Sequence, residues 1–290
     1  MKSISNKMIL IFFIVLLLSF DAYSQNVWFK RVLITNDNGI EDTKTLELAK
    51  AFSQIAETYV AVPAENKSGS STYLGAVSKG IVKTERREMG SGIIAYAVDG
   101  YPAVCVAIAC LAIMKDNLPD LVISGINGGP NLGTDWLGSG TIGAARIAAF
   151  AGVPAIAVSG LDSRIPGSLE FAINWIVNFV KSDVVKNLKA PNYLTIGIPR
   201  ISPDKIQGVR IAERSTLVDY PEFEKVTTGD NDNKKEAWKI VGRIKLKTSP
   251  PDSSDVVLYK KDFIIVTPMI ANEIDHQLLD SLKKDLYKID

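Results

Sequence analysis

The chain of 290 residues has few of the side chains that most often carry covalent or redox chemistry. Its two cysteines, Cys105 and Cys110, lie in an apolar segment that predicts a buried helix over residues 102–114. A five-residue offset places them on different sides of that helix, so we expect two buried free thiols and no disulfide. The single histidine, His276, shows no sign of pairing with a nucleophile, which argues against serine–histidine catalysis.

The chain also lacks an excess of charge of one sign. It contains 33 basic and 32 acidic residues, and 47% of its residues are hydrophobic, which is typical of a globular protein. A protein that binds polymeric nucleic acid usually carries a basic stripe. We therefore expect no polymeric nucleic acid as partner, whereas a small phosphorylated substrate is compatible with this balance.

A hydrophobic run long enough to cross a membrane is missing as well. The apolar run Met8–Leu18 has 11 residues, and a transmembrane helix needs about 20. It follows Lys2 and Lys7 and precedes the small residues around Ser24, which together are typical of a secretory signal over residues 1–24. We predict cleavage after Ser24 and export to the periplasm or medium, with no membrane association afterwards; an uncleaved anchor is the alternative.

Short β-branched runs alternate with segments of helical apolar spacing after the signal. Because apolar strands that alternate with helices form parallel sheets covered on both faces, we predict a Rossmann-like, three-layer α/β core over residues 25–185. Residues 186–290 contain strand-like runs without helical links, which predicts a C-terminal β-rich appendage. The predicted core strands are Val32–Thr35, Thr58–Val62, Ile93–Val98, Leu121–Ser124 and Ala155–Ser159, and the later ones are Tyr193–Ile198, Val209–Ala212, Trp238–Val241 and Ile264–Thr267.

Polar loops follow three of the predicted strands. The first, Asn36–Gly39, carries Asp37, whose carboxylate could hold a hard divalent cation; an Asn-Gly hairpin turn is the alternative. The second, Asn66–Thr72, offers hydroxyls, a glycine and a lysine to a phosphate, unless it is simply a flexible surface loop.

The third loop, Ser124–Gly133, is rich in glycine and is followed by Gly138–Thr141 before a predicted helix. Ser139 and Thr141 at that helix N-terminus would favour an anion. Parallel sheets bind ligands at the carboxyl ends of their strands, so we expect the three loops to meet. The run Gly138–Gly143 also spells G-x-G-x-x-G, which would suggest a nicotinamide enzyme, but the expected strand directly before the glycines is missing.

Taken in order, these motifs strongly resemble the SurE family (survival protein E). The matching residues are Val32–Ile40, Lys67–Gly69, Ser124–Asn127, Gly129–Gly133, Ser139–Thr141, Gly100–Pro102, Gly208–Arg210 and Val266–Pro268. The resemblance implies a metal-dependent phosphomonoesterase that hydrolyses nucleoside 5′- and 3′-monophosphates. It also implies one divalent ion, Mn²⁺ or Mg²⁺, and a homodimer or homotetramer assembled through the C-terminal part.

Carried over position by position, the resemblance assigns the metal ligands to Asp37, Asn38, Ser68 and Asn127, with Asp37 also catalytic. The phosphate- and substrate-binding residues would be Asn36, Gly69, Asn131, Ser139, Gly140 and Thr141. The chain has Asn38 where the family has a second aspartate, which removes one negative charge from the expected site. A catalytically weakened nucleotide- or phosphate-binding relative is therefore the alternative to the enzyme.

Overall fold

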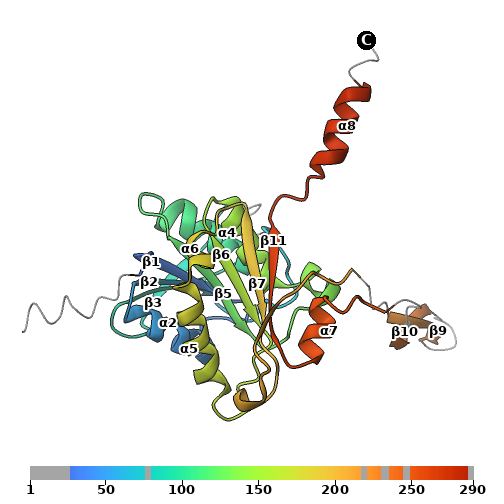
Figure 1. Cartoon of the computed structure of the whole chain (residues 1–290), viewed down its shortest axis with the longest axis horizontal. Coiled ribbons are helices and arrows are strands. Elements are labelled where there is room, and N and C mark those ends of the chain that lie inside the picture. The colour runs from blue at the N-terminus through green and yellow to red at the C-terminus, as the bar shows by residue number, and fades with distance from the viewer. Residues whose placement is uncertain (1–26, 76–79, 217–220, 230–234, 244–248, 287–290) are drawn as a thin grey trace, which may run out of the picture.

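The computed structural model of the chain describes residues 27–75, 80–216, 221–229, 235–243 and 249–286. The predicted signal over residues 1–24 lies outside these ranges. A nine-stranded sheet runs through the molecule in the order β3-β4-β2-β1-β5-β6-β7-β11-β8 (Figure 1). Its strands are β1 (Arg31–Thr35), β2 (Glu57–Pro63), β3 (Thr84–Arg87), β4 (Ile93–Val98), β5 (Leu121–Asn127), β6 (Ala155–Ser159), β7 (Asn192–Gly197), β8 (Val209–Ile211) and β11 (Ile264–Ile270).

Six neighbouring strands, β4-β2-β1-β5-β6-β7, run parallel to one another. At one end β3 pairs antiparallel with β4, and at the other β11 pairs antiparallel with β7. The longer helices are α2 (Thr43–Ser53), α3 (Pro102–Ile108), α4 (Gly140–Phe150), α5 (Ser168–Val180) and α8 (His276–Leu286), and the shorter ones are α6 (Asp183–Lys186) and α7 (Asp255–Lys260).

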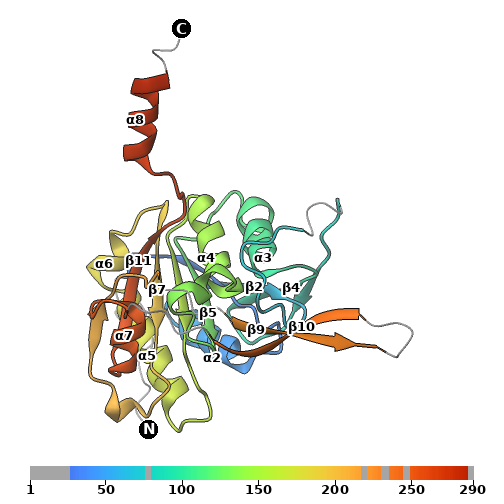
Figure 2. The same ribbon diagram turned by 90° about the vertical axis from the view of Figure 1, so that its right-hand side faces the viewer.

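The side chains of the sheet alternate between two cores, as the two-residue period of a strand requires. On β1, Val32 and Ile34 pack toward α2 and α5, whereas Leu33 packs toward α3 and α4. All three side chains are fully buried. Helices therefore cover both faces of the sheet, and the predicted three-layer α/β architecture is confirmed (Figure 2).

We predicted a separate β-rich appendage over residues 186–290, and the structure differs from this prediction. Strands β7, β11 and β8 extend the main sheet, and the region also contains the helices α7 and α8, which we did not expect. Because β11 runs antiparallel to β7, it needs no crossover helix packed on the sheet. Within the described residues, β9 (Pro221–Thr228) and β10 (Lys235–Arg243) form a hairpin outside the sheet. The hairpin and α8 project from the body (Figures 1 and 2).

The two cysteines lie in the protein interior. Cys105 and Cys110 are free and buried, as predicted, and burial raises the pKa of the Cys110 thiol to about 11. The predicted helix over residues 102–114 consists of α3 followed by one π-helical turn, Ala109–Ile113. In the described part of the chain, every helix is too short or too polar to cross a bilayer.

Candidate active site

The site lies where the sheet order changes direction. From β1 the chain passes to β2 on one side, and it returns to β5 on the other side of β1. In sheets of this kind, ligands bind in the crevice outside the carboxyl ends of the strands at such a point. Asp37 follows β1 and Asn127 ends β5, so these two expected metal ligands lie at the ends of neighbouring strands beside this crevice.

Asp37 is a buried carboxylate with an incomplete set of hydrogen bonds. It is 3% exposed, and its Oδ1 atom is buried without a hydrogen-bond partner. Burial raises the pKa of Asp37, and the neighbouring hydroxyl and backbone N–H of Thr141 oppose this rise only in part. The Thr141 hydroxyl does not reach hydrogen-bonding geometry, since its oxygen is also buried without a partner. Such a carboxylate is well suited to bind a positive charge.

Asn36 has a role that differs from the expected contact with substrate. Its side chain is fully buried, with Oδ1 accepting from the Gly39 backbone N–H at 3.0 Å. Its Nδ2 donates to the Gly39 carbonyl and to the Thr45 hydroxyl. Because both ends of the amide are used inside the protein, Asn36 shapes the loop that presents Asp37 and offers no group to a ligand.

The N-terminus of α4 meets the loop after β2 directly beside Asp37. A Cβ atom on Gly140 would lie 2.8 Å from Ser70 Oγ and 3.1 Å from Asp37 Cβ, so this close approach requires glycine. Ser70 Oγ is buried without a hydrogen-bond partner. Ser139 is the N-cap of α4 and accepts from the Ile142 backbone N–H at 3.1 Å. The first two loops and the segment Gly138–Thr141 therefore meet beside Asp37, as expected.

Ser70 is the residue of this group that the sequence motifs did not single out. Ser68, the expected ligand, and Gly69 are exposed on the same loop, and the Ser68 backbone N–H donates to Asn66 Oδ1. The hydroxyl that reaches the neighbourhood of Asp37 and Gly140 belongs to Ser70. Successive serines have the same chemistry, so the sequence offered no signal to rank them.

The other loop residues lie after β5. Asn127 donates from Nδ2 to the Gly129 carbonyl at 2.9 Å, which leaves its side-chain oxygen as the group to offer a cation. Asn131 has a positive φ of 51° and donates from Nδ2 to Ser159 Oγ at 2.8 Å. Asn38 is partly buried, and its Nδ2 atom has no hydrogen-bond partner.

A buried ion pair from the C-terminal part of the chain holds this loop. Arg214 donates from Nη1 to the Asn131 carbonyl at 2.8 Å and to Asp255 Oδ2 at 2.9 Å. The side chain of Asp255 is fully buried and also accepts from the backbone N–H groups of Gly133, Ser215 and Val256. The motifs gave no indication of this pair, because its two residues are 41 positions apart and far from the loop in sequence.

The side-chain donors at the site suit a hard divalent cation. No group of three or more His, Cys, Asp or Glu side chains that could hold a metal occurs in the ranges that the structure describes. The expected ligands are instead one carboxylate, two amides and a hydroxyl, which are oxygen donors of the kind that Mg²⁺ and Mn²⁺ accept. The unpartnered Oδ1 of Asp37 fits such an ion.

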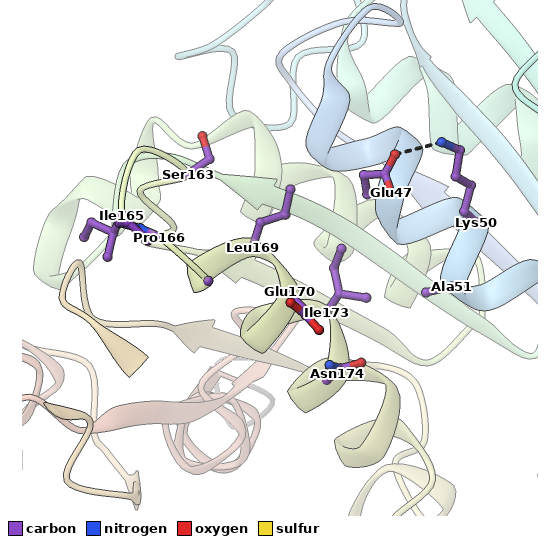
Figure 3. A pocket seen from close by; sticks show the side chains of 11 residues that line it. Glu47, Lys50, Ala51, Ser163, Ile165, Pro166, Leu169, Glu170, Ile173 and Asn174 are labelled. Atoms are coloured by element: carbon purple, nitrogen blue, oxygen red, sulfur yellow. Dashed lines mark hydrogen bonds and ion pairs between the residues drawn. The ribbon is translucent and has the colours of Figure 1, made fainter. Parts of the chain in front are cut away.

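A separate cavity of about 610 Å³ lies between α2 and the start of α5 and contains none of the expected site residues (Figure 3). Ile165, Leu169 and Ile173 supply much of its apolar surface. Its charged residues include Glu47 and Lys50, which form an ion pair with each other. We therefore place the candidate active site in the crevice at Asp37 and not in this cavity.

The glycines at 138–143 do not form a dinucleotide-binding turn. The segment before α4 is a 3₁₀ helix, Gly133–Leu137, and β5 has already ended at Asn127. A dinucleotide fingerprint requires a strand that leads directly into the glycines. The nicotinamide interpretation of this motif is therefore set aside.

Fold and site together define the class: an α/β protein with a carboxylate, amides, hydroxyls and a helix N-terminus gathered at the switch point of a parallel sheet. The model of the family "Survival protein SurE" matches residues 32–218. The chain belongs to this SurE family.

Similar proteins cover nearly the whole chain. A 5′-nucleotidase SurE from Fervidobacterium nodosum is 33% identical over 254 residues, which is 87% of this chain and 95% of the relative. A 5′-nucleotidase SurE from Petrotoga mobilis is 32% identical over 254 residues, 87% of this chain and 97% of the relative. The crystal structure of the SurE protein from Aquifex aeolicus superimposes with a TM-score of 0.69 at 25% identity, over 88% of this chain and 98% of that one.

Proposed function

We propose that the protein is a phosphomonoesterase that uses one divalent ion, Mn²⁺ or Mg²⁺, to hydrolyse nucleoside 5′-monophosphates, and 3′-monophosphates as well, to nucleoside and phosphate. The observation that carries the proposal is that Asp37 Oδ1, Ser70 Oγ and Thr141 Oγ1 are all buried and unpartnered, while Asp37 and Ser70 lie against Gly140 at the N-terminus of α4. Membership of the family and the names of its relatives support the same activity.

The roles of the side chains follow from their chemistry. Asp37, Asn38, Ser68 and Asn127 would hold the ion, which when bound polarises a phosphoryl oxygen and lowers the pKa of a water ligand. The hydroxyls of Ser70 and Thr141 would donate to phosphate oxygens, and the dipole of α4 favours the negative charge. Gly140 lets Ser70 and Asp37 pack against the start of α4.

Phosphate release from AMP and 3′-AMP tests the proposal, measured colorimetrically with added Mn²⁺ and after treatment with EDTA. We expect release with Mn²⁺, little release with EDTA, and a loss of at least 100-fold in Asp37→Asn. The matched control is Asp183→Asn, which makes the same chemical change at an exposed carboxylate on α6. Nucleotide binding without phosphate release would instead favour the non-catalytic relative that lacks a second aspartate at Asn38.

We also propose that the protein is exported after cleavage following Ser24. The short apolar run Met8–Leu18 and the small residues before Gln25 support this. N-terminal sequencing of protein recovered outside the cytoplasm should begin at Gln25. A chain that still carries Met8–Leu18 would contradict cleavage.

We further propose that the protein forms a homodimer or homotetramer. Ile240 pairs with Phe223 across the β9–β10 hairpin, and Trp238 lies on the same face two residues away. These three side chains are 55–64% exposed, and an apolar group of this size on a projecting hairpin is typical of an interaction surface. Light scattering should give a mass of two or four chains, and a monomer at micromolar concentration would refute the proposal.

A further inference from the structure

An open cavity of about 670 Å³ adjoins the proposed phosphate site. The loop from Gly69 to Leu74 and the side chain of Tyr101 line it. Its size is in the range of cavities that bind small molecules. None of the expected metal ligands lines it, whereas Gly69, an expected phosphate-binding residue, and Ser70, assigned above to the phosphate, both do.

Two tyrosines form an aromatic wall in this cavity. The ring centroids of Tyr73 and Tyr101 are 4.8 Å apart, and the planes meet at 76°. The Tyr73 ring also lies against Gly75, yet more than half of the residue remains accessible. Tyr73 is 55% exposed, and the Lys67 ammonium group lies 5.8 Å from the centroid of the Tyr101 ring. A flat aromatic ligand with a nearby negative charge would match these groups.

Both tyrosines are tied closely to the phosphate site. The Tyr73 backbone N–H donates to the Ser70 carbonyl at 3.0 Å, so one turn carries the ring and the hydroxyl beside Asp37. Tyr101 directly precedes Pro102, whose Cγ atom would lie 3.2 Å from a Cβ on Gly140. Ser70 and Pro102 therefore both contact the start of α4, and each tyrosine is within three residues of such a contact.

We propose that Tyr73 and Tyr101 form the subsite for the nucleobase of the substrate, so that the enzyme selects phosphate esters that carry an aromatic base over simple sugar phosphates. The inference rests on the proposed phosphomonoesterase activity. Every nucleobase has a π-face, so any of the bases can stack on an aromatic side chain. The phosphate would bind at the start of α4 while the base lies against the tyrosine rings.

Selectivity between AMP and ribose 5-phosphate tests the subsite, because the two substrates share the phosphate and the ribose. The loss of one base–aromatic stack corresponds to a factor of about 5 to 150. In Tyr73→Ala, we expect the ratio of kcat/KM for AMP to that for ribose 5-phosphate to fall by this factor, mainly through KM. Tyr73→Phe keeps the ring and should keep the ratio.

The matched control is Phe150→Ala, which removes another exposed ring, 57% exposed, at the opposite end of α4. It should leave the ratio unchanged. An equal loss for both substrates in Tyr73→Ala, or no loss for either, would overturn the subsite. If the wild-type protein hydrolyses neither substrate, the proposed function fails. AMP binding measured by calorimetry then decides the subsite alone, and binding that is absent, or equal in wild type and Tyr73→Ala, overturns it.

Discussion

The ion pair between Arg214 and Asp255 should be among the costliest contacts in the protein to break. The two charges are 2.9 Å apart, with the Asp255 side chain fully buried and the Arg214 side chain 12% exposed. Removing one partner of a buried pair costs about 3–5 kcal/mol, since it leaves the other charge buried and uncompensated. The structure allows the two single substitutions to be placed within this range.

In Arg214→Met, Asp255 keeps three backbone N–H donors, so we expect a loss near the lower limit, about 3 kcal/mol. In Asp255→Asn, the guanidinium keeps only neutral acceptors, the Asn131 carbonyl and the Thr195 hydroxyl. An amide N–H₂ also replaces a carboxylate oxygen that accepted backbone N–H groups. We therefore expect a larger loss, about 4 kcal/mol.

Urea unfolding followed by far-UV circular dichroism measures these losses, provided that the m-values of the variants agree. The double variant, Arg214→Met with Asp255→Asn, should lose less than the sum of the single losses by about 2 kcal/mol, because the residues share one network. Additive losses, or a cost below about 1 kcal/mol for Arg214→Met, would refute the reasoning.

Four further predictions follow from the site and the surface. Asp37→Asn should raise the Tm of the metal-free protein at pH 7. Burial raises the pKa of the Asp37 carboxyl, so this group stabilises the fold below its unfolded pKa and loses that contribution as the pH rises through its folded pKa. A neutral amide avoids this loss, and a lower Tm in calorimetry would contradict the reasoning. Adding Mn²⁺ should raise the Tm of wild type and not of Asp37→Asn, and equal rises would remove Asp37 from the ion site. Asn38→Asp should tighten Mn²⁺ binding about tenfold or more without substrate, because it adds a negative charge beside the ion; equal affinities in calorimetric titrations would show that Asn38 does not face the ion. Cys105 and Cys110, being buried, should both resist an aromatic disulfide reagent in the native protein and react in guanidinium; fast native reaction would show that their helix opens.

Much of the fold was predictable from local patterns. Continuous apolar runs such as Val32–Thr35 indicate strands buried on both faces, and the helices between them imply parallel order. The α7 helix was missed because six residues carry little periodicity. The α8 helix was missed as well, although Leu278, Leu279 and Leu282 have a spacing compatible with a helix.

The site was predictable where one residue type stands alone and unpredictable where neighbours are alike. Asp37 is a carboxylate directly after a strand, and the structure brings it to the sheet edge as expected. Asn36 was expected to bind substrate, whereas its amide bonds to the backbone of Gly39. The sequence cannot separate these uses, because the same N–H and C=O groups serve a ligand or the residue's own loop. Contacts such as that of Arg214 with Asn131, 83 positions apart, depend on the packed fold and leave no local pattern.

That long-range contact gives the protein a built-in order of assembly. Every residue expected at the site lies between Asn36 and Thr141, yet the backbone of the Asn131 loop is held by Arg214 and Asp255. Contacts over such separations carry a loop-closure cost, and this one cannot form before Arg214 and Asp255 have been synthesised. A nascent chain that has passed residue 141 would contain every residue expected at the site and still lack Arg214 and Asp255, which hold the Asn131 loop. The enzyme would therefore become active only after nearly the whole chain has been synthesised and, if it is exported, delivered across the membrane.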